Sequence, residues 1–167
     1  MEQKRTLSLL VDNTAGVLSR VAGLFSRRAY NIDSITAGVT ADPRFTRMTV
    51  VCSGDDLILE QITKQLEKLV DVRDIKVLEK EDSVHRELIL VKIRVNEAER
   101  RNIIAIADVF RGRIVDVGQE SVIVELTGSQ SKLEGFLNLV QGYEILELAR
   151  TGVTGLSRGA HDVRYLD

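Results

Sequence analysis

The stretch that decides the fold is Thr6–Phe25, with the sequence TLSLLVDNTAGVLSRVAGLF. Its first part, Thr6–Val11, is short and apolar and ends at the polar pair Asp12-Asn13, which is typical of a buried strand followed by a turn. From Val17 onward the apolar residues recur at helical spacing, while Arg20 takes the remaining face. The stretch therefore predicts a strand, a polar turn that contains a glycine, and an amphipathic helix.

The residues that follow continue this alternation of strand and helix. Two strands, Ile32–Thr40 and Thr46–Cys52, are joined by a turn around Asp42-Pro43 and form a predicted hairpin. Apolar residues at helical spacing predict a second amphipathic helix over Leu57–Leu69, and Val72–Leu78 has the pattern of a fourth strand. The element order of this first part of the chain is βαββαβ.

The same order appears a second time after the charged stretch Glu79–Arg86. The second set is predicted as strand, helix, two hairpin strands, helix and strand, at Leu88–Val95, Glu97–Arg111, Arg113–Val117, Ser121–Leu126, Leu133–Val140 and Glu144–Ala149. The fold class is therefore α+β, with two tandem ferredoxin-like βαββαβ units: a domain at residues 1–79, a linker at 80–86 and a second domain at 87–167. Arg150–Asp167 has no periodicity, and we expect a loop or tail that orders against something else.

Each unit should place two helices on one face of an antiparallel sheet, which leaves the opposite face in need of cover. In the first strand Leu7 and Leu9 point one way, yet Leu10 on the other face is also apolar, and Val51 stands out in its strand in the same manner. Either a second copy of the chain covers this face, giving a homodimer or larger assembly, or Leu10 and Val51 are ordinary exposed apolar residues.

The composition excludes several classes of protein. With 44% hydrophobic residues, 29% charged residues and a formal net charge of -2, the chain has the balance of a globular protein without a strong general attraction to nucleic acid or anionic membranes. Cys52 is the only cysteine, which rules out an intramolecular disulfide and fits a reducing compartment. The polar Met1–Arg5 segment and the lack of an apolar run of about 18 residues predict neither a signal peptide nor a membrane span, so we expect a cytoplasmic protein.

The turn Asp12–Leu18 is the most informative chemical feature. The start of a helix carries unpaired N–H groups and a partial positive charge, so it binds carboxylates readily, and Gly16 lets a ligand approach the backbone closely. Asn31, just before the second strand, offers a side-chain amide to the ammonium or carboxylate group of a ligand. Structural roles explain the same residues, with Asn13 or Thr14 capping the start of the helix and Asn31 capping its end. The pattern by itself leaves both roles open.

The chain also resembles a known family over nearly its whole length. Residues 6–78 resemble an ACT domain, which is an amino-acid-binding module. Four segments are similar to the N-terminal part of the small regulatory subunit of acetohydroxyacid (acetolactate) synthase: Asn13–Arg20, Gly23–Phe25, Arg28–Ser34 and Arg47–Thr49. Three further segments are similar to the C-terminal domain of that subunit: His85–Lys92, Phe110–Val117 and Ala149–Gly159.

The resemblance implies a non-catalytic regulatory subunit in branched-chain amino acid biosynthesis. In that family the feedback inhibitor, usually valine, binds at the interface of an ACT-domain homodimer, and we expect the C-terminal domain to contact and activate the catalytic large subunit. The effector-binding residues implied here are Asn13, Thr14, Ala15, Gly16, Val17, Leu18, Asn31 and Ile32, the last two contributed by the facing copy. Ala29, where relatives often have glycine, and Gly38 depart from the family pattern near this site, which leaves the identity of the amino acid open.

No residue pattern indicates a catalytic or metal site. His85 and His161 are the only histidines, and neither has the spacing of a metal ligand or a partner of a nucleophile. Gly54-Asp55-Asp56 superficially matches a thiamine-diphosphate motif but lacks its second glycine, so we expect the start of a helix there. The acidic stretch Glu79–Asp82 is either a cation site or simply exposed. Thiamine diphosphate, magnesium and FAD are expected in the catalytic partner, and no cofactor in this chain.

The alternative function is a free-standing ACT-type amino-acid sensor that regulates another enzyme or transcription, because one fold serves many functions. The segments similar to the C-terminal domain favour the synthase. The absence of a basic helix-turn-helix pattern disfavours direct binding to DNA.

Overall fold

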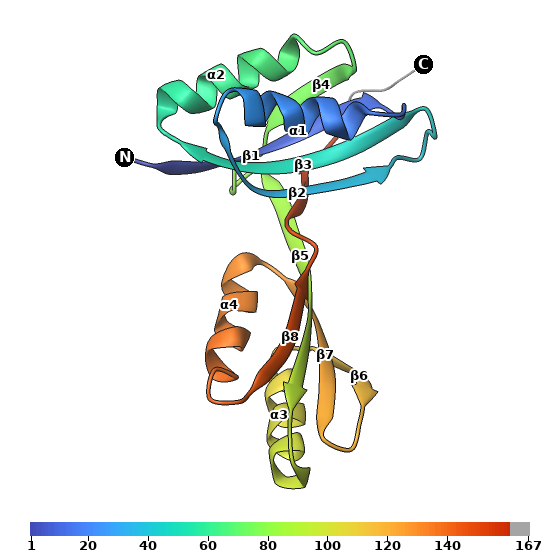
Figure 1. Ribbon diagram of the computed structural model, residues 1–167, viewed down its shortest axis with the longest axis vertical. Helices are drawn as coiled ribbons and strands as arrows, with labels where there is room; N and C mark the ends of the chain where they lie inside the picture. Colours follow the sequence, from blue (N-terminus) through green and yellow to red (C-terminus); the bar gives the residue numbers. More distant parts are fainter. Residues whose placement is uncertain (161–167) are drawn as a thin grey trace. The chain divides into compact units, whose positions relative to one another are not determined.

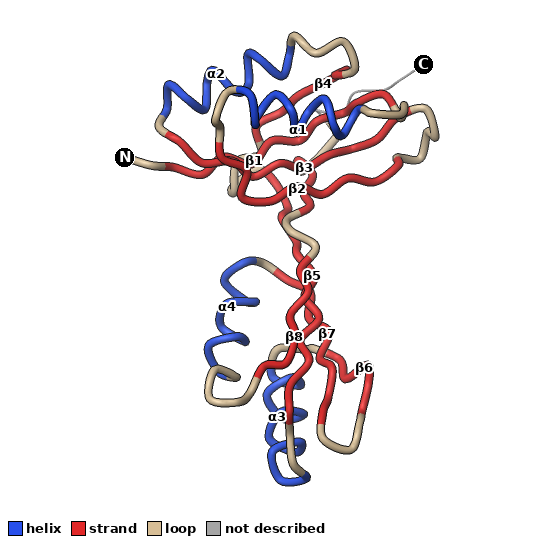
Figure 2. Tube along the Cα trace, in the orientation of Figure 1, coloured by secondary structure: helices blue, strands red, loops and turns tan. Residues whose placement is uncertain are grey.

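The computed structural model describes residues 1–160 and divides the chain into two compact units (Figure 1). The first unit consists of Met1–Val84 together with the segment that starts at Val153, and the second consists of His85–Gly152. Helices and strands alternate in both units as the sequence predicts (Figure 2). No helix within residues 1–160 is long and apolar enough to cross a membrane.

The first unit is a four-stranded antiparallel sheet with two helices on one face (Figure 1). Its elements are β1 (Gln3–Asp12), α1 (Val17–Arg27), β2 (Asn31–Val39), β3 (Phe45–Gly54), α2 (Asp56–Glu67) and β4 (Val72–Val77). The strand order is β2-β3-β1-β4, so β2 and β4 form the edges. In the register of β1 with β3, Gln3 lies opposite Gly54 and Asp12 lies opposite Phe45. One end of the sheet therefore carries the turn after β1, and the other end carries the start of β2.

The core of the first unit lies between the sheet and its helices. Each helix buries one apolar face, because its buried residues recur three and four positions apart. These helical residues are Val17, Val21, Leu24 and Phe25 in α1 and Leu59, Ile62 and Leu66 in α2. Alternate residues of the central strands complete the core, namely Leu7, Leu9, Val11, Met48, Val50 and Cys52. Because burial of one such large side chain contributes roughly 1.5–3 kcal/mol, this layer holds α1 and α2 in place on the sheet.

The second unit repeats this plan. Its elements are β5 (Ser83–Arg94), α3 (Glu97–Val109), β6 (Arg113–Val117), β7 (Ser121–Gly128), α4 (Gln130–Leu139) and β8 (Ile145–Arg150). The strand order is β6-β7-β5-β8, which is the order of the first unit with each strand replaced by its counterpart. Ile89, Val91 and Ile93 of β5 pack against α3 and α4 in a separate core. The predicted fold class, α+β with two βαββαβ units, is confirmed.

The boundary between the units differs from the expected linker at residues 80–86. Strand β5 already begins at Ser83, inside that range. Ser83 is buried and its hydroxyl donates a hydrogen bond to the carbonyl of Glu79, so this segment is folded onto the first unit. The four charged residues Glu79–Asp82 are all exposed and precede the strand, so the charge of the stretch does not prevent strand formation from Ser83 onward.

The C-terminal part of the expected second domain, 87–167, also differs, because the compact second unit ends at Gly152. A short strand, β9 (Thr154–Ser157), follows and pairs with β5. The N–H group of Arg158 then donates to the carbonyl of Asp82 at 2.7 Å. A strand of this length is too short to show alternation, which is why the sequence predicted only that the tail orders against something else. His161 lies outside the described residues.

The tail is held on the sheet of the first unit by two hydrogen bonds. The hydroxyl of Thr36 in β2 donates to the carbonyl of Val153 at 3.0 Å. The N–H group of Gly155 donates to the hydroxyl of Thr49 in β3 at 3.3 Å, in a buried position. Because side chains alternate along β3, Thr49 lies on the face opposite the helices, so the tail covers part of that face.

The burial of Leu10 and Val51 in the single chain decides between the two explanations for these residues. Leu10 is 2% exposed and Val51 is 9% exposed in the single chain, so the alternative in which they are ordinary exposed residues is wrong. Ser8 and Thr49 on the same face are buried as well. These four residues therefore need no second copy of the chain to leave water.

Candidate functional site

The candidate site begins with the loop between β1 and α1, residues 13–16. Gly16 is the N-cap residue of α1 and has the left-handed conformation, with φ 84°, which favours glycine. No side chain caps this helix, so the alternative in which Asn13 or Thr14 caps α1 is wrong. The first N–H groups of α1 therefore lack a side-chain acceptor, which favours an anion at this end of the helix.

Asn13 joins the loop to the hairpin between β2 and β3. Its side-chain amide donates to the carbonyl of Pro43 at 2.9 Å, and its side-chain oxygen accepts from the hydroxyl of Thr46 at 3.2 Å. Its backbone N–H donates to the carbonyl of Arg44 at 2.8 Å. Both ends of the Asn13 side chain thus bind other parts of the protein, so this residue shapes the loop.

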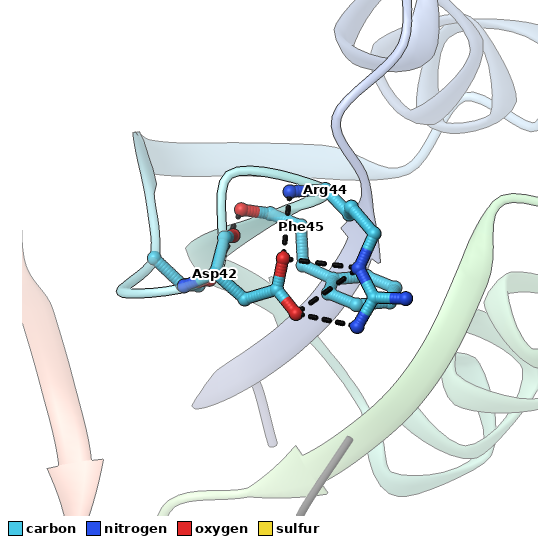
Figure 3. Close-up of polar contacts among 4 residues, drawn as sticks. Asp42, Arg44 and Phe45 are labelled. Atoms are coloured by element: carbon cyan, nitrogen blue, oxygen red, sulfur yellow. Dashed lines mark hydrogen bonds and ion pairs between the residues drawn. The ribbon is translucent and has the colours of Figure 1, made fainter. Parts of the chain in front are cut away.

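The hairpin turn that Asn13 contacts is itself tightly bonded. The guanidinium of Arg44 donates to both carboxylate oxygens of Asp42, at 2.7 Å from Nη2 to Oδ2, and lies 5.2 Å from the centre of the Phe45 ring (Figure 3). The hydrogen bonds from Arg44 lower the pKa of Asp42. The hydroxyl of Thr40 donates to the carbonyl of Asp42 at 2.7 Å. These bonds fix the conformation of the turn at residues 42–45, which lies beside the loop.

On the other side, two ion pairs join the loop region to β4 and to Asp71, the residue directly before that strand. Arg20 of α1 donates to both carboxylate oxygens of Asp71, with Nε–Oδ2 at 2.6 Å and Nη2–Oδ1 at 3.1 Å. Arg73 donates to both carboxylate oxygens of Asp12, at 2.7 Å and 2.9 Å. The hydrogen bonds from Arg20 lower the pKa of Asp71, and those to Asp12 raise the pKa of Arg73. These bidentate pairs fix direction as well as distance.

The other predicted residues of this stretch separate into two groups. Thr14, Ala15 and Leu18 are exposed around the start of α1. Val17 is buried in the core of the first unit, so its side chain anchors the end of the loop to that core. The exposed residues surround the helix start that has no cap.

Asn31 and Ile32 lie at the start of β2. Asn31 is the first residue of that strand, and its amide donates to the carboxylate of Asp33 at 3.2 Å. Helix α1 ends at Arg27, and the backbone N–H of its C-cap residue Arg28 donates to Leu24 O, so the alternative in which Asn31 caps α1 is wrong. Ile32 is half-buried and packs against the core.

The two halves of the predicted site lie at opposite ends of one sheet. Thr46, which contacts Asn13, and Ser53, which pairs with Asn31, are both in β3. At about 3.3 Å per residue along a strand, these two positions are roughly 23 Å apart. A single chain therefore does not bring Asn13–Leu18 and Asn31–Ile32 together.

The end of α1 explains the departure at Ala29. Ala29 has φ 54°, the left-handed conformation, and its N–H donates to Ser26 O at 3.3 Å. The N–H of Tyr30 donates to Phe25 O at 2.9 Å, and the two rings pack edge to face at 6.2 Å. This is a Schellman ending, in which glycine is the usual residue at the position of Ala29. The departure thus concerns the helix end, about one helix length from the loop.

Other candidate residues have structural roles. Asp55 caps α2 by accepting from the N–H of Ile58 at 2.8 Å, which confirms that Gly54-Asp55-Asp56 starts a helix. Burial raises the pKa of the Cys52 thiol to about 11, so this cysteine is not a nucleophile at neutral pH. Within residues 1–160 no three or more His, Cys, Asp or Glu side chains gather as a metal site.

Sequence reasoning did not identify Arg20, Asp71 or the turn at residues 42–45 as parts of the candidate site. Arg20 and Asp71 are 51 positions apart, so no local pattern connects them. A signal was present in the polar Asp71-Val72-Arg73 segment, where charged residues interrupt the start of an edge strand, but its partners could not be named from the sequence.

Comparisons with known proteins agree with this architecture. Residues 7–74 match the model of the AHAS small subunit-like ACT domain, and residues 86–159 match the model of the small subunit of acetolactate synthase. The probable acetolactate synthase small subunit of Methanothermobacter thermautotrophicus is 50% identical over 155 residues, 92% of each chain. The acetolactate synthase small subunit of Mycolicibacterium smegmatis is 46% identical over 158 residues, 95% of this chain and 93% of that one.

A solved structure shows the same fold. The acetolactate synthase small subunit of Thermotoga maritima superposes with a TM-score of 0.87 at 40% identity, covering 95% of this chain and 99% of that one. The two family matches and the named relatives define the class as a regulatory subunit rather than an enzyme. The chain belongs to the acetolactate synthase small-subunit family.

Proposed function

We propose that this chain is the cytoplasmic regulatory subunit that activates the thiamine-diphosphate-dependent catalytic subunit of acetolactate synthase. We further propose that valine, or another branched-chain amino acid, binds between the N-terminal units of two copies and confers feedback inhibition. Family membership supports the regulatory role and a catalytic partner. Thiamine diphosphate, magnesium and FAD are then expected in that partner.

The observation that carries the proposal is the division of the predicted site between opposite ends of the first sheet. Strand β2 lies at the sheet edge, and it begins at Asn31. If two copies pair through antiparallel β2 strands, the Asn31 end of one copy lies beside the Asn13 end of the other. A two-fold homodimer of this kind brings together residues that one chain keeps apart.

The chemistry of the assembled residues suits an amino acid. The uncapped start of α1 at Gly16 offers backbone N–H groups to a carboxylate. The side-chain oxygen of Asn31 suits an ammonium group, since an amide oxygen accepts hydrogen bonds. Leu18 and Ile32 offer branched apolar surface to a branched side chain. We therefore place the ligand between the α1 start of one copy and the β2 start of the other.

Activation is assigned to the second unit. Residues 153–158 bond to the first unit, so we assign the contact with the catalytic subunit to His85–Gly152. Ligand binding in the first unit would favour an assembly with weaker activation, and such coupling typically amounts to about 1–3 kcal/mol. The ligand must prefer one of the two assemblies for this to occur.

The test is acetolactate formation by the purified catalytic subunit, with and without this chain, across a series of valine concentrations. Stimulation that valine reverses is expected. In Gly16→Asp, a carboxylate at the helix start repels the ligand and strains a left-handed position, so stimulation should persist without inhibition. No stimulation, combined with amino-acid binding by the chain alone, would identify a free-standing sensor instead.

A further inference from the structure

Asp71 holds both ends of the loop that precedes α1. Its backbone carbonyl accepts from the N–H of Asp12, just before the loop, at 2.9 Å. Its carboxylate accepts two hydrogen bonds from Arg20, in the first turn of the helix after the loop. Asp71, the residue directly before β4, therefore fixes the separation between the end of β1 and the beginning of α1.

The guanidinium of Arg20 also lies against the end of the loop. Its Nη2 is 3.5 Å from the carbonyl of Ala15. A Cβ atom built on Gly16 would lie 3.0 Å from Nη1 of Arg20, which is tighter than ordinary contact. Any side chain at position 16 would thus push on the group that binds Asp71, in addition to straining the left-handed backbone.

The exposure of the pair indicates that its main effect is on geometry. The Arg20 side chain is 47% exposed and the Asp71 side chain 9% exposed, and ion pairs open to water on one side contribute little to stability. An arginine fork that binds two carboxylate oxygens does, however, fix the orientation of both groups. Lysine preserves the charge and loses that fork, which separates the two effects experimentally.

We propose that Arg20 and Asp71 are positioning residues of the amino-acid site: their ion pair fixes the backbone of Asn13–Gly16 so that the first N–H groups of α1 meet the ligand carboxylate. This inference rests on the proposed function, because it assigns a role in binding the same ligand. Neither residue contacts the ligand, and both act through the loop.

The experiment is titration calorimetry of L-valine, L-leucine and L-isoleucine into the full chain. The variants are Arg20→Lys, Asp71→Asn and the double variant. Glu60→Gln is the matched control, because it removes a carboxylate that pairs with Lys64 at 3.0 Å on the surface of α2, away from the loop. Hydrogen exchange of the Asn13–Gly16 amides and thermal melting of each free chain accompany the titrations.

Each single variant should raise the dissociation constant about tenfold, since hydrogen bonds between charged groups are lost from the support of the loop. The dissociation constant of the double variant should be no higher than that of the single variant that binds less tightly. This follows because either single change already breaks the ion pair. Faster exchange at Asn13–Gly16 should accompany only a small change in melting temperature, because a partly exposed ion pair contributes little to stability. The control should bind as the wild-type chain does.

Wild-type affinity in both single variants would overturn the inference, as would a double variant whose loss is the product of the two single losses. Weaker binding that only follows a lower melting temperature would also overturn it, because that indicates a general structural role. If Asp71→Asn does not fold, Arg20→Lys decides alone. If the wild-type chain binds none of the three amino acids, the proposed function itself fails, and the inference with it.

Discussion

The two units share one topology but differ in whether a side chain caps the start of their first helix. In the second unit, Asn96 caps α3 by accepting from the N–H of Glu99 at 2.8 Å, and Glu99 accepts from the N–H of Asn96 at 3.1 Å. In the first unit, α1 starts at left-handed Gly16 without a side-chain cap. The first N–H groups of the helix are therefore capped by side chains in the second unit. In the first unit they have no side-chain cap, and there we place the ligand.

The sheet faces opposite the helices differ in a similar way. In the first unit, the tail around β9 covers part of this face, and Leu10 on the same face is buried. In the second unit, Leu90 on the corresponding face of β5 is 39% exposed. The two units thus share a topology but have different surfaces, and four measurements test this difference.

The largest effect is expected from ending the chain after Gly152. This removes β9, takes away the hydrogen-bond partners of Thr36 and Thr49 and uncovers part of the face that also carries Leu10 and Val51. We expect a loss of about 3 kcal/mol in the free energy of unfolding of the first unit and none in the second. Urea titration with hydrogen exchange separates the units, and a chain ended after Ala160 is the control. Equal stability of both truncated chains would show that the tail is not needed as cover.

The helix starts can be compared directly by removing side chains. Asn96→Ala removes the capping box of α3 and should lower stability by about 1 kcal/mol. Thr14→Ala in the first unit should change stability by less than about 0.5 kcal/mol, because Thr14 does not cap α1. Both are measured by urea unfolding. A comparable loss for Thr14→Ala would mean that the two helix starts are not treated differently.

The helix ends, in contrast, are alike. Arg111 follows α3 in the left-handed conformation with φ 58°, as Ala29 follows α1 with φ 54°. Ala29→Gly and Arg111→Gly should each stabilise the chain by about 0.5 kcal/mol, since relief of left-handed strain exceeds the added entropy of the unfolded chain. Thermal melting tests this, with Ala22→Gly in the middle of α1 as a control that should destabilise.

The smallest effect concerns acid. Hydrogen bonds from Arg20 lower the pKa of Asp71 in the folded chain, so the ionised form stabilises the fold. This contribution is complete above the ordinary carboxyl pKa of about 4 and is lost as the pH falls through the lowered folded value. Urea midpoints measured from about pH 6 to about pH 3 should therefore fall less steeply for Asp71→Asn than for the wild-type chain. If the urea midpoints of both chains fall equally steeply with pH, the Arg20–Asp71 pair does not contribute to the acid sensitivity of the fold.

The fold class, the repeated βαββαβ order and the polar turn at Asp12–Gly16 can all be predicted from the amino-acid sequence. These properties depend on residues close together in the chain, such as the apolar period of α1 and the alternation in β3, so local physics specifies them. The turn could be located for the same reason. The resemblance of short segments then identified the family.

The contacts that build the turn and the segment that packs on the first sheet become known only from the folded chain. Asn13 binds the β2–β3 hairpin, Arg20 binds Asp71, and the segment after Gly152 bonds to Thr49. Each contact joins residues far apart in sequence, where periodicity carries no information about partners. The separation of Asn13 from Asn31 likewise follows from strand order and register, which depend on how the whole sheet packs.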